Sequence, residues 1–359
     1  VALSLIRAAL ESGKKVVTAN KAMLAEHGAE LAIEAERAGS IIAYESAVAG
    51  GVPIVKSLRE SLAATKVRVI YGILNGTCNY VLSTMRDTGR DFDDVLQEAQ
   101  ELGYAEADPS FDVDGIDAAH KLTLLASLAF GGKPRLDAVH IEGIRSISAT
   151  DVAFADELGY RIKLLGLARM TEHGLEQRLH PCLVSKTTPI ASIEGVLNAV
   201  VVDAEPVDTI VHEGRGAGAG PTASAVVADL IDIARGIHLP MFGVRASELR
   251  DHPVSPMGAH QGCYYIRMSV LDQPGVMADI AAILCEIEQH IDDPLPGPVI
   301  CVTPAAPRGE HGKPVASEQL GRVRAGPRRK KRRMFEQPNQ LARFAQLDGG
   351  CPRFHLGQC

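Results

Sequence analysis

The sequence predicts an α/β protein in which a parallel-sheet segment is followed by an α+β domain with a sheet of its own. Helical and short apolar strand patterns alternate over residues 2–45, as they do where helices connect parallel strands. Residues 158–212 instead contain several short strand patterns in succession. A length of 359 residues, with 46% hydrophobic and 23% charged residues, is enough for two or three domains with real cores.

The first elements have clear limits. Apolar spacing predicts a helix over residues 2–13, a short buried strand over 14–19, a helix over 21–38 and a second short strand over 41–45. Asn20 is a suitable N-cap for the second helix. A glycine follows each helix, as is common at helix ends.

The middle of the chain supplies the second domain. Residues 66–73 alternate like a strand, and the next three helices are expected over 77–87, 91–102 and 118–128, the last of them strongly apolar. Four strands are then expected, over residues 160–169, 179–184, 196–202 and 209–211.

The C-terminal part differs in composition. We expect a strand over 263–271, a turn over 272–275 and a helix over 276–290. Residues 292–359 then carry 12 Lys and Arg against 6 Asp and Glu, including six consecutive cations at 328–333. This tail is predicted to be disordered. The basic run could attract polyanions, but no stacking aromatics or groove-entering helix accompany it, so nucleic-acid binding is a minor alternative.

Several protein classes are disfavoured by composition. No segment approaches the roughly 18 apolar residues that a membrane span needs. The seven cysteines are scattered and include no Cys-x-x-Cys pair, which predicts reduced thiols in a cytoplasmic protein without a zinc or redox motif. The N-terminus does not resemble a signal peptide, and we interpret it as an internal start.

An acidic segment, residues 103–121, carries five carboxylates and ends in a lysine. A calcium loop with Gly115 at its sixth position would begin at Ser110 and end at Lys121, so both anchor positions lack the required carboxylate. Asp117 and Lys121 are four residues apart and share one face of a helix. Because that helix is apolar, we expect Lys121 to be partly desolvated and able to exchange a proton, although a solvated pair is the simpler alternative.

Two other stretches are ambiguous. The glycine-rich loop 214–220 precedes a helix predicted over 221–235, so its N–H groups could approach a phosphate. The loop lacks the glycine spacings of established nucleotide-binding loops, and tight backbone packing explains its glycines equally well. In residues 44–53, a strand ends in Glu45 and small residues follow. Backbone carbonyl groups exposed at such a strand end, together with one carboxylate, suit a hard cation. A buried turn is the better interpretation of that pattern alone.

Several stretches together resemble homoserine dehydrogenase. The acidic segment matches the family signature at Ala99, Gly103, Asp108, Pro109, Asp112, Gly115, Asp117 and Lys121. Residues 17–22, 44–53, 72–77 and 216–224 are also similar to family motifs and follow the family order. The resemblance covers roughly residues 1–290 and implies hydride transfer between NADP or NAD and aspartate 4-semialdehyde, giving L-homoserine.

The resemblance also implies residue roles. Lys121 would be the catalytic general acid and, in reverse, the base, with Asp117 as its partner. Glu106 and Asp117 would hold the substrate, with Glu106 at its ammonium group, and Asp112 would support that polar site. Lys21 would lie beside both the substrate and the cofactor.

The cofactor and cation sites follow in the same way. Gly103 and the loop containing Gly218 and Gly220 would approach the nicotinamide end of the cofactor. The family's monovalent-cation site, usually for sodium, would be formed by Glu45 and the carbonyl groups of Val48, Gly50 and Val52.

The domain organisation implied by the resemblance is an incomplete Rossmann-type parallel sheet, an α+β catalytic domain, a partial ACT (ferredoxin-like) unit and a tail. The nucleotide-binding remnant is predicted over residues 1–60, completed by helix 214–236, and the catalytic and dimerisation domain over 61–213. A linker over 237–260, the ACT part over 261–291 and the tail over 292–359 are predicted to follow. Because the Gly-x-Gly-x-x-Gly turn is not in this sequence, weak NAD(P) binding is expected.

A homo-oligomer, dimer or tetramer, is also implied, with threonine as a candidate effector. Two alternatives stay open at this point. The chain could be an inactive fragment that binds amino acids through its ACT part, or a dehydrogenase of a related amino-aldehyde. The sequence does not distinguish NAD from NADP, because the discriminating acid or arginine is not among these residues.

Overall fold

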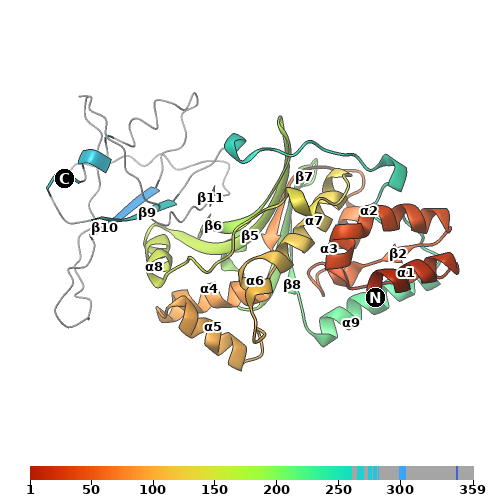
Figure 1. Ribbon diagram of the computed structural model, residues 1–359, viewed down its shortest axis with the longest axis horizontal. Coiled ribbons are helices and arrows are strands. Elements are labelled where there is room, and N and C mark those ends of the chain that lie inside the picture. Colours follow the sequence, from red (N-terminus) through yellow and green to blue (C-terminus); the bar gives the residue numbers. More distant parts are fainter. Residues whose placement is uncertain are drawn as a thin grey trace. The chain divides into compact units, whose positions relative to one another are not determined.

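The computed structural model describes residues 1–260, 265–270, 274–276, 278–280, 282, 299–304 and 345–346. The chain divides into two units, Val1–His260 and Gln261–Cys359. The first unit contains both predicted sheets and all the candidate site residues (Figure 1).

The N-terminal elements form a small parallel α/β unit. Helix α1 (Ala2–Glu11) leads to β1 (Val16–Val17), and α2 (Lys21–Arg37) leads to β2 (Ile42–Ala43). The two strands pair in parallel, which confirms the prediction from alternating helices and strands. Each strand is only two residues long, and β1 is half-buried rather than buried as expected. The reason is that this sheet has only these two strands in the described part of the chain, so β1 is not enclosed between neighbours.

The larger sheet of the first unit is mostly antiparallel. Its order is β6-β5-β3-β7-β8, and the short strand β4 pairs with β6 in parallel. The strands are β3 (Lys66–Ile73), β4 (His140–Ile141), β5 (Tyr160–Thr171), β6 (Gly174–Ser185), β7 (Leu197–Glu205) and β8 (Asp208–Arg215). Strand β6 begins five residues earlier than predicted because it forms a hairpin with β5, with Thr171 opposite Gly174.

Helices pack on this sheet and bring the acidic segment to it (Figure 1). The helices of this part of the chain are α3 (Ile54–Lys56), α4 (Gly76–Thr88), α5 (Phe92–Glu101), α6 (Ser110–Val113), α7 (Ile116–Phe130) and α8 (Ala149–Glu157). Of these, α4, α7 and α8 make the main contacts with the strands. Helix α7 contacts β3, β5 and β6, and every residue from Asp117 to Leu128 is buried. Gly115, with a φ of 89°, makes the turn that begins this helix.

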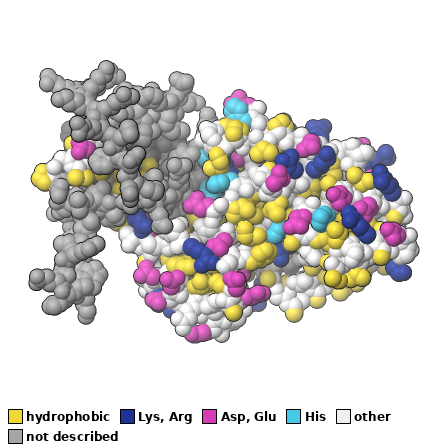
Figure 2. Space-filling view, viewed as in Figure 1, with side chains coloured by type: hydrophobic (Ala, Val, Ile, Leu, Met, Phe, Trp, Pro, Cys, Tyr) yellow, Lys and Arg dark blue, Asp and Glu magenta, His cyan; other side chains and the backbone are white. Residues whose placement is uncertain are grey.

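Helix α9 (Ala219–Ala234) follows β8 and returns to the N-terminal unit, where it contacts β1 and the short turn Glu45–Ala47. Figure 1 shows α9 with these N-terminal elements, although it lies far from them in the sequence. On the face drawn in Figure 2, acidic side chains gather at the lower edge, where Figure 1 places α4 and α5.

In the second unit, β9 (Tyr265–Val270) pairs in parallel with β10 (Val299–Pro304), and β11 spans Ala345–Gln346. Strand β9 agrees with the strand predicted over 263–271. Strands β10 and β11 lie within the tail that was predicted to be disordered. Most of the helix predicted over 276–290 and of the remaining tail lies outside the described residues. Among the helices that are described, none has the length and apolarity of a membrane span.

Candidate active site

A buried lysine and aspartate on α7 form the centre of the site. The Nζ atom of Lys121 lies 2.7 Å from Asp117 Oδ2 and donates a second 2.7 Å hydrogen bond to the carbonyl oxygen of Leu74. Both charged residues are buried, with 8% of Lys121 and 6% of Asp117 exposed. The helical spacing of four residues brings the two side chains together, and the apolar helix removes them from water.

A second lysine completes the pairing of Asp117. Lys21, the first residue of α2, places Nζ 3.1 Å from Asp117 Oδ1. Burial alone would raise the pKa of Asp117, but the charges of Lys121 and Lys21, with hydrogen bonds from Lys121 and Asn75, outweigh it and lower the pKa to about 2. Asp117 is therefore a permanent anion between two cations at neutral pH.

Asn75 joins the two acids of the site. It is the N-cap of α4, where its Oδ1 accepts the backbone N–H of Cys78 at 2.8 Å. Its Nδ2 donates to Asp112 Oδ1 at 2.7 Å and to Asp117 Oδ2 at 2.9 Å. Asn75 lies in the motif of residues 72–77, from which no role was predicted for it. Its position as an asparagine directly before a helix was the available signal.

The remaining predicted substrate residues lie on the solvent side of this pair. Burial and the neighbouring charges of Asp117 and Glu106 raise the pKa of Asp112, although the hydrogen bond from Asn75 opposes the rise. Glu106 is exposed, but it is close enough to Asp112 for its charge to act there. The structure thus brings together Lys121, Asp117, Lys21 and Asp112, with Glu106 at the edge.

His120 is a further polar residue that sequence reasoning missed. It is 5% exposed, and its Nδ1 has no hydrogen-bond partner within the described residues. Burial, together with the charge of Lys21, lowers the pKa of His120. The ring lies against Phe111, with centroids 5.6 Å apart. His120 is therefore neutral at pH 7 and lines the polar cluster without carrying charge.

The glycine-rich loop is tightly packed at one of its glycines and exposed at two others, so both interpretations of its sequence apply. Gly216 is buried, and a Cβ there would overlap the carboxamide of Asn198. Tight packing therefore explains this glycine. Gly218 (φ of 106°) and Gly220 are exposed at the start of α9, and no atom lies within 4 Å of a Cβ built at Gly220. These two positions leave backbone N–H groups open to a ligand.

Gly103 is also exposed and has a φ of 75° in the turn after α5. The next residue, Tyr104, accepts a 2.7 Å hydrogen bond from Thr77 Oγ1 at the start of α4. The turn that carries Gly103 is thereby tied to the same helix terminus as Asn75.

The proposed cation residues surround a buried turn. Glu45 is 3% exposed, and its carboxylate accepts backbone N–H groups of Val55 at 3.1 Å and Lys56 at 2.8 Å. Burial raises the pKa of Glu45 to about 7. Gly50 has a φ of 44°, and a Cβ there would overlap the carbonyl group of Gly216. The predicted carbonyl ligands Val48 and Val52 are buried beside it, and Val52 also accepts the N–H of Ile54 at 2.8 Å.

Within the described residues, no group of three or more His, Cys, Asp or Glu side chains could hold a metal. A cation at Glu45 would therefore depend on backbone carbonyl oxygens, which hard cations accept as ligands.

The chain is similar to known proteins in sequence and in structure. Residues 53–231 match the family model described as homoserine dehydrogenase. The chain is 50% identical over 292 residues to homoserine dehydrogenase of Pseudomonas aeruginosa, which covers 80% of this chain and 67% of that protein. It is 46% identical over 298 residues to homoserine dehydrogenase of Neisseria gonorrhoeae, covering 81% and 68%. The crystal structure of a homoserine dehydrogenase from Thiobacillus denitrificans aligns with a TM-score of 0.76 at 48% identity, covering 79% of this chain and 67% of that chain.

The glycine-rich loop, the parallel unit and the buried lysine–aspartate pair, together with these relatives, define the protein as an oxidoreductase. The chain belongs to the homoserine dehydrogenase family, and it spans about two thirds of the length of these relatives. This confirms the resemblance drawn from the motifs, and homoserine dehydrogenase is its function. NAD(P) is the cofactor of the family. The alternative of an amino-acid-binding module alone is not favoured, because the matched residues include α7 and its charged pair.

Proposed function

We propose that Lys121 is the proton donor and acceptor when this chain interconverts L-homoserine and aspartate 4-semialdehyde. The observation that carries this assignment is the buried ammonium group, held 2.7 Å from both Asp117 Oδ2 and the Leu74 carbonyl oxygen. An ammonium group has three N–H donors, so one remains for the substrate oxygen. Hydride addition to an aldehyde creates an alkoxide, and a fixed cationic donor stabilises that charge and supplies the proton.

The carboxylates of the site differ in how well they could bind the substrate's ammonium group. Asp117 is already neutralised by Lys121 and Lys21, so its part is to orient both cations. Asp112, whose pKa is raised by burial and neighbouring acids, forms no ion pair with a lysine or arginine of the described residues and would gain most from the substrate ammonium. Glu106 provides a second carboxylate at the open edge. Charge-assisted hydrogen bonds to carboxylates are the natural means of holding an ammonium group.

The cofactor would be held by Lys21, Gly103, Gly218 and Gly220. The exposed glycines fit this purpose because they present backbone N–H groups without side chains in the way. A solved relative, a hyperthermophilic archaeal homoserine dehydrogenase, is in complex with NADPH. When bound, the nicotinamide supplies or accepts the hydride. Lys21 lies 3.1 Å from Asp117 and would place its charge between cofactor and substrate.

Three further parts of the proposal come from the family resemblance. A sodium ion would bind Glu45 and the carbonyl oxygens of Val48, Gly50 and Val52, a role supported by the burial of Glu45 and its high pKa. The protein would act as a dimer or tetramer, and threonine would be its effector through an ACT unit in the C-terminal part.

The test of the catalytic assignment is Lys121→Met. We expect kcat for homoserine oxidation, followed at the reduced-nicotinamide band, to fall by about 10²- to 10⁴-fold. The KM for NADP should change little. Lys133→Met is the matched control, because Lys133 is an exposed lysine paired with Asp251 away from the site. A Lys121→Met protein that keeps its Tm and stays within a few-fold of the original kcat would show that another group moves the proton.

A further inference from the structure

A buried amide lies where the catalytic strand meets the glycine-rich loop. Asn198 is 2% exposed and directly precedes Ala199, where the pairing of β7 with β3 begins. The register places Ala199 opposite Ile73. Asn198 comes directly before Ala199, and Leu74, whose carbonyl oxygen accepts a hydrogen bond from Lys121, comes directly after Ile73. On its other side, the Asn198 carboxamide occupies the space that a side chain on Gly216 would need. Its Oδ1 is 3.4 Å from a Cβ built on Gly76.

This amide lacks a partner in the protein. Its Nδ2 is buried and makes no hydrogen bond to any described residue. Buried amide donors are almost always satisfied, because an unpaired donor loses its hydration without compensation. An apolar side chain of the same size would fill the space without that cost. A polar side chain at this position therefore points to an acceptor that the protein itself does not provide.

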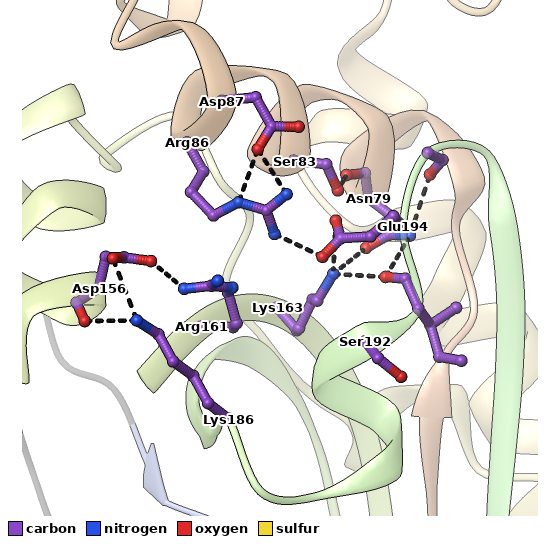
Figure 3. Close-up of polar contacts among 12 residues, drawn as sticks. Asn79, Ser83, Arg86, Asp87, Asp156, Arg161, Lys163, Lys186, Ser192 and Glu194 are labelled. Carbon is purple, nitrogen blue, oxygen red and sulfur yellow. Dashed lines mark hydrogen bonds and ion pairs between the residues drawn. The ribbon is translucent and has the colours of Figure 1, made fainter. Parts of the chain in front are cut away.

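The segment before Asn198 is held by a polar clamp, which we define as Lys163 and Asn79 (Figure 3). Asn79 Nδ2 donates to the carbonyl oxygens of Gly195 at 2.9 Å, Ile193 at 3.2 Å and Leu197 at 3.4 Å. Buried Lys163 on β5 donates to Asn79 Oδ1 at 3.0 Å and to the Ile193 carbonyl group.

The segment that the clamp holds also packs against the start of α4. A Cβ on Gly76 would lie 2.6 Å from the Val196 carbonyl oxygen, so the segment 193–197 rests directly on the start of α4. Glu194 adds ion pairs to Lys163 and Arg86. The clamp therefore fixes the residues immediately before Asn198 against the same helix terminus that carries Asn75.

We propose that Asn198 is a ligand-binding residue of this active site and that the Lys163–Asn79 clamp is the device that positions it. The ligand group is an oxygen acceptor, which can be the carboxamide oxygen of the nicotinamide or the carboxylate of the amino-acid substrate. The Asn198 carboxamide lies against Gly216 of the proposed cofactor loop, and Asn198 directly precedes the partner of Ile73, the residue before Leu74. Either ligand group would therefore be bound near this amide. This proposal rests on the active site proposed above.

Asn198→Leu separates binding from stability. We expect the Tm to stay at or above that of the unchanged protein, because an unpaired buried donor is removed. We expect kcat/KM to fall about tenfold or more, because a hydrogen bond to the ligand is lost. Asn198→Asp, which keeps the shape but removes the donor, should show the same kinetic loss. Asp203→Asn, on the same strand but in an ion pair with Arg68, is the control that should leave both KM values unchanged.

The KM values identify the source of the acceptor. A rise in the KM for NADP alone assigns the amide to the cofactor, and a rise in the KM for homoserine alone assigns it to the substrate. Unchanged kinetics in Asn198→Leu overturn the proposal, as does a lower Tm in both variants with unchanged KM for the folded enzyme. If the catalytic assignment of Lys121 is wrong, the Lys121→Met protein will be active. This result differs from unchanged kinetics in Asn198→Leu, so failure of the Lys121 assignment can be told apart from failure of the Asn198 proposal.

The clamp is tested by a double-mutant cycle. Lys163→Met should raise the same KM as Asn198→Leu, and the double variant should lose less than the product of the two losses, because both act on one contact. Lys186→Met is the control, since Lys186 bonds Asp156 at the margin of the same cluster and does not touch segment 193–197 (Figure 3). If the losses of Lys163→Met and Asn198→Leu multiply fully in the double variant, the clamp does not position Asn198. The same conclusion follows if Lys186→Met raises the KM as much as Lys163→Met does.

Discussion

At the scale of single residues, Asp117 organises the site because its carboxylate binds side chains from three parts of the fold. Its two oxygens receive Lys21 from α2, Lys121 from α7 and Asn75 from the turn before α4. Burial makes the ion expensive, and the two adjacent ammonium groups more than compensate, which is why its pKa is low. The charge of Asp117 is thus a condition for assembling the cluster as well as for holding substrate.

This gives a prediction about acid stability. The folded pKa of about 2 lies below the ordinary 3.8, so Asp117 stabilises the fold above pH 3.8 and loses that contribution as the pH falls toward 2. A shift of this size is worth about 2 kcal/mol. Unfolding free energies from urea titrations between pH 2 and 6 should fall less steeply for Asp117→Asn than for the unchanged protein. Parallel curves would show that Asp117 has no depressed pKa.

At the scale of elements, the glycine-rich loop is fixed by the strands and helices around it. Gly51 donates its N–H to the Arg215 carbonyl oxygen at 3.0 Å, and Gly216 rests on Asn198 of β7. The loop is therefore held between the turn of residues 44–53 on one side and the sheet on the other. Its open end begins α9 at Gly218.

Gly216→Ala should disturb this arrangement. The new methyl group would overlap the Asn198 carboxamide, so the loop must shift, at a cost of about 1–3 kcal/mol. We expect a lower Tm and a higher KM for NADP. Gly258→Ala is the matched control, because nothing lies within 4 Å of a Cβ there and it should change neither quantity. An unchanged Gly216→Ala protein would mean that the loop tolerates displacement without loss of cofactor binding.

At the scale of the whole first unit, α9 joins the end of the larger sheet to the N-terminal parallel unit through buried charges. Asp229 of α9 is 1% exposed and accepts the Glu45 N–H at 2.9 Å. Lys56 lies 3.3 Å from Asp229 and pairs with Asp232 as well. Glu45 therefore joins the nearby start of α3 to the distant helix α9, and its ionisation affects both.

Sodium should stabilise this junction in a pH-dependent way. The folded pKa of Glu45, about 7, lies above the ordinary 4.5, so its contribution to stability is complete below pH 4.5 and is lost as the pH rises through 7. A cation bound to the ionised carboxylate would restore that loss. Sodium chloride should thus raise the Tm more than choline chloride at equal ionic strength at pH 8, and the difference should shrink at pH 5. Glu45→Gln should abolish it, whereas an equal sodium effect in Glu45→Gln would place any cation elsewhere.

The sequence was sufficient for features that depend on neighbours along the chain. Helical spacing placed Asp117 and Lys121 on one face, and Asn20 was correctly identified as the cap of α2. Strand β3 was predicted at its observed limits because its alternation is regular. The motif order also identified the family, since a long signature with several fixed residues rarely arises by chance.

Tertiary structure alone decided which distant residues complete the site. Lys21 and Asp117 are 96 positions apart, and they meet only because α2 packs on α7. The Leu74 carbonyl group, the bridging amide of Asn75 and the Asn198–Gly216 contact likewise depend on strand register and loop packing. Local periodicity determined the faces of the helices, whereas the burial that sets the charges and pKa values came from the way the folded chain brings those faces together.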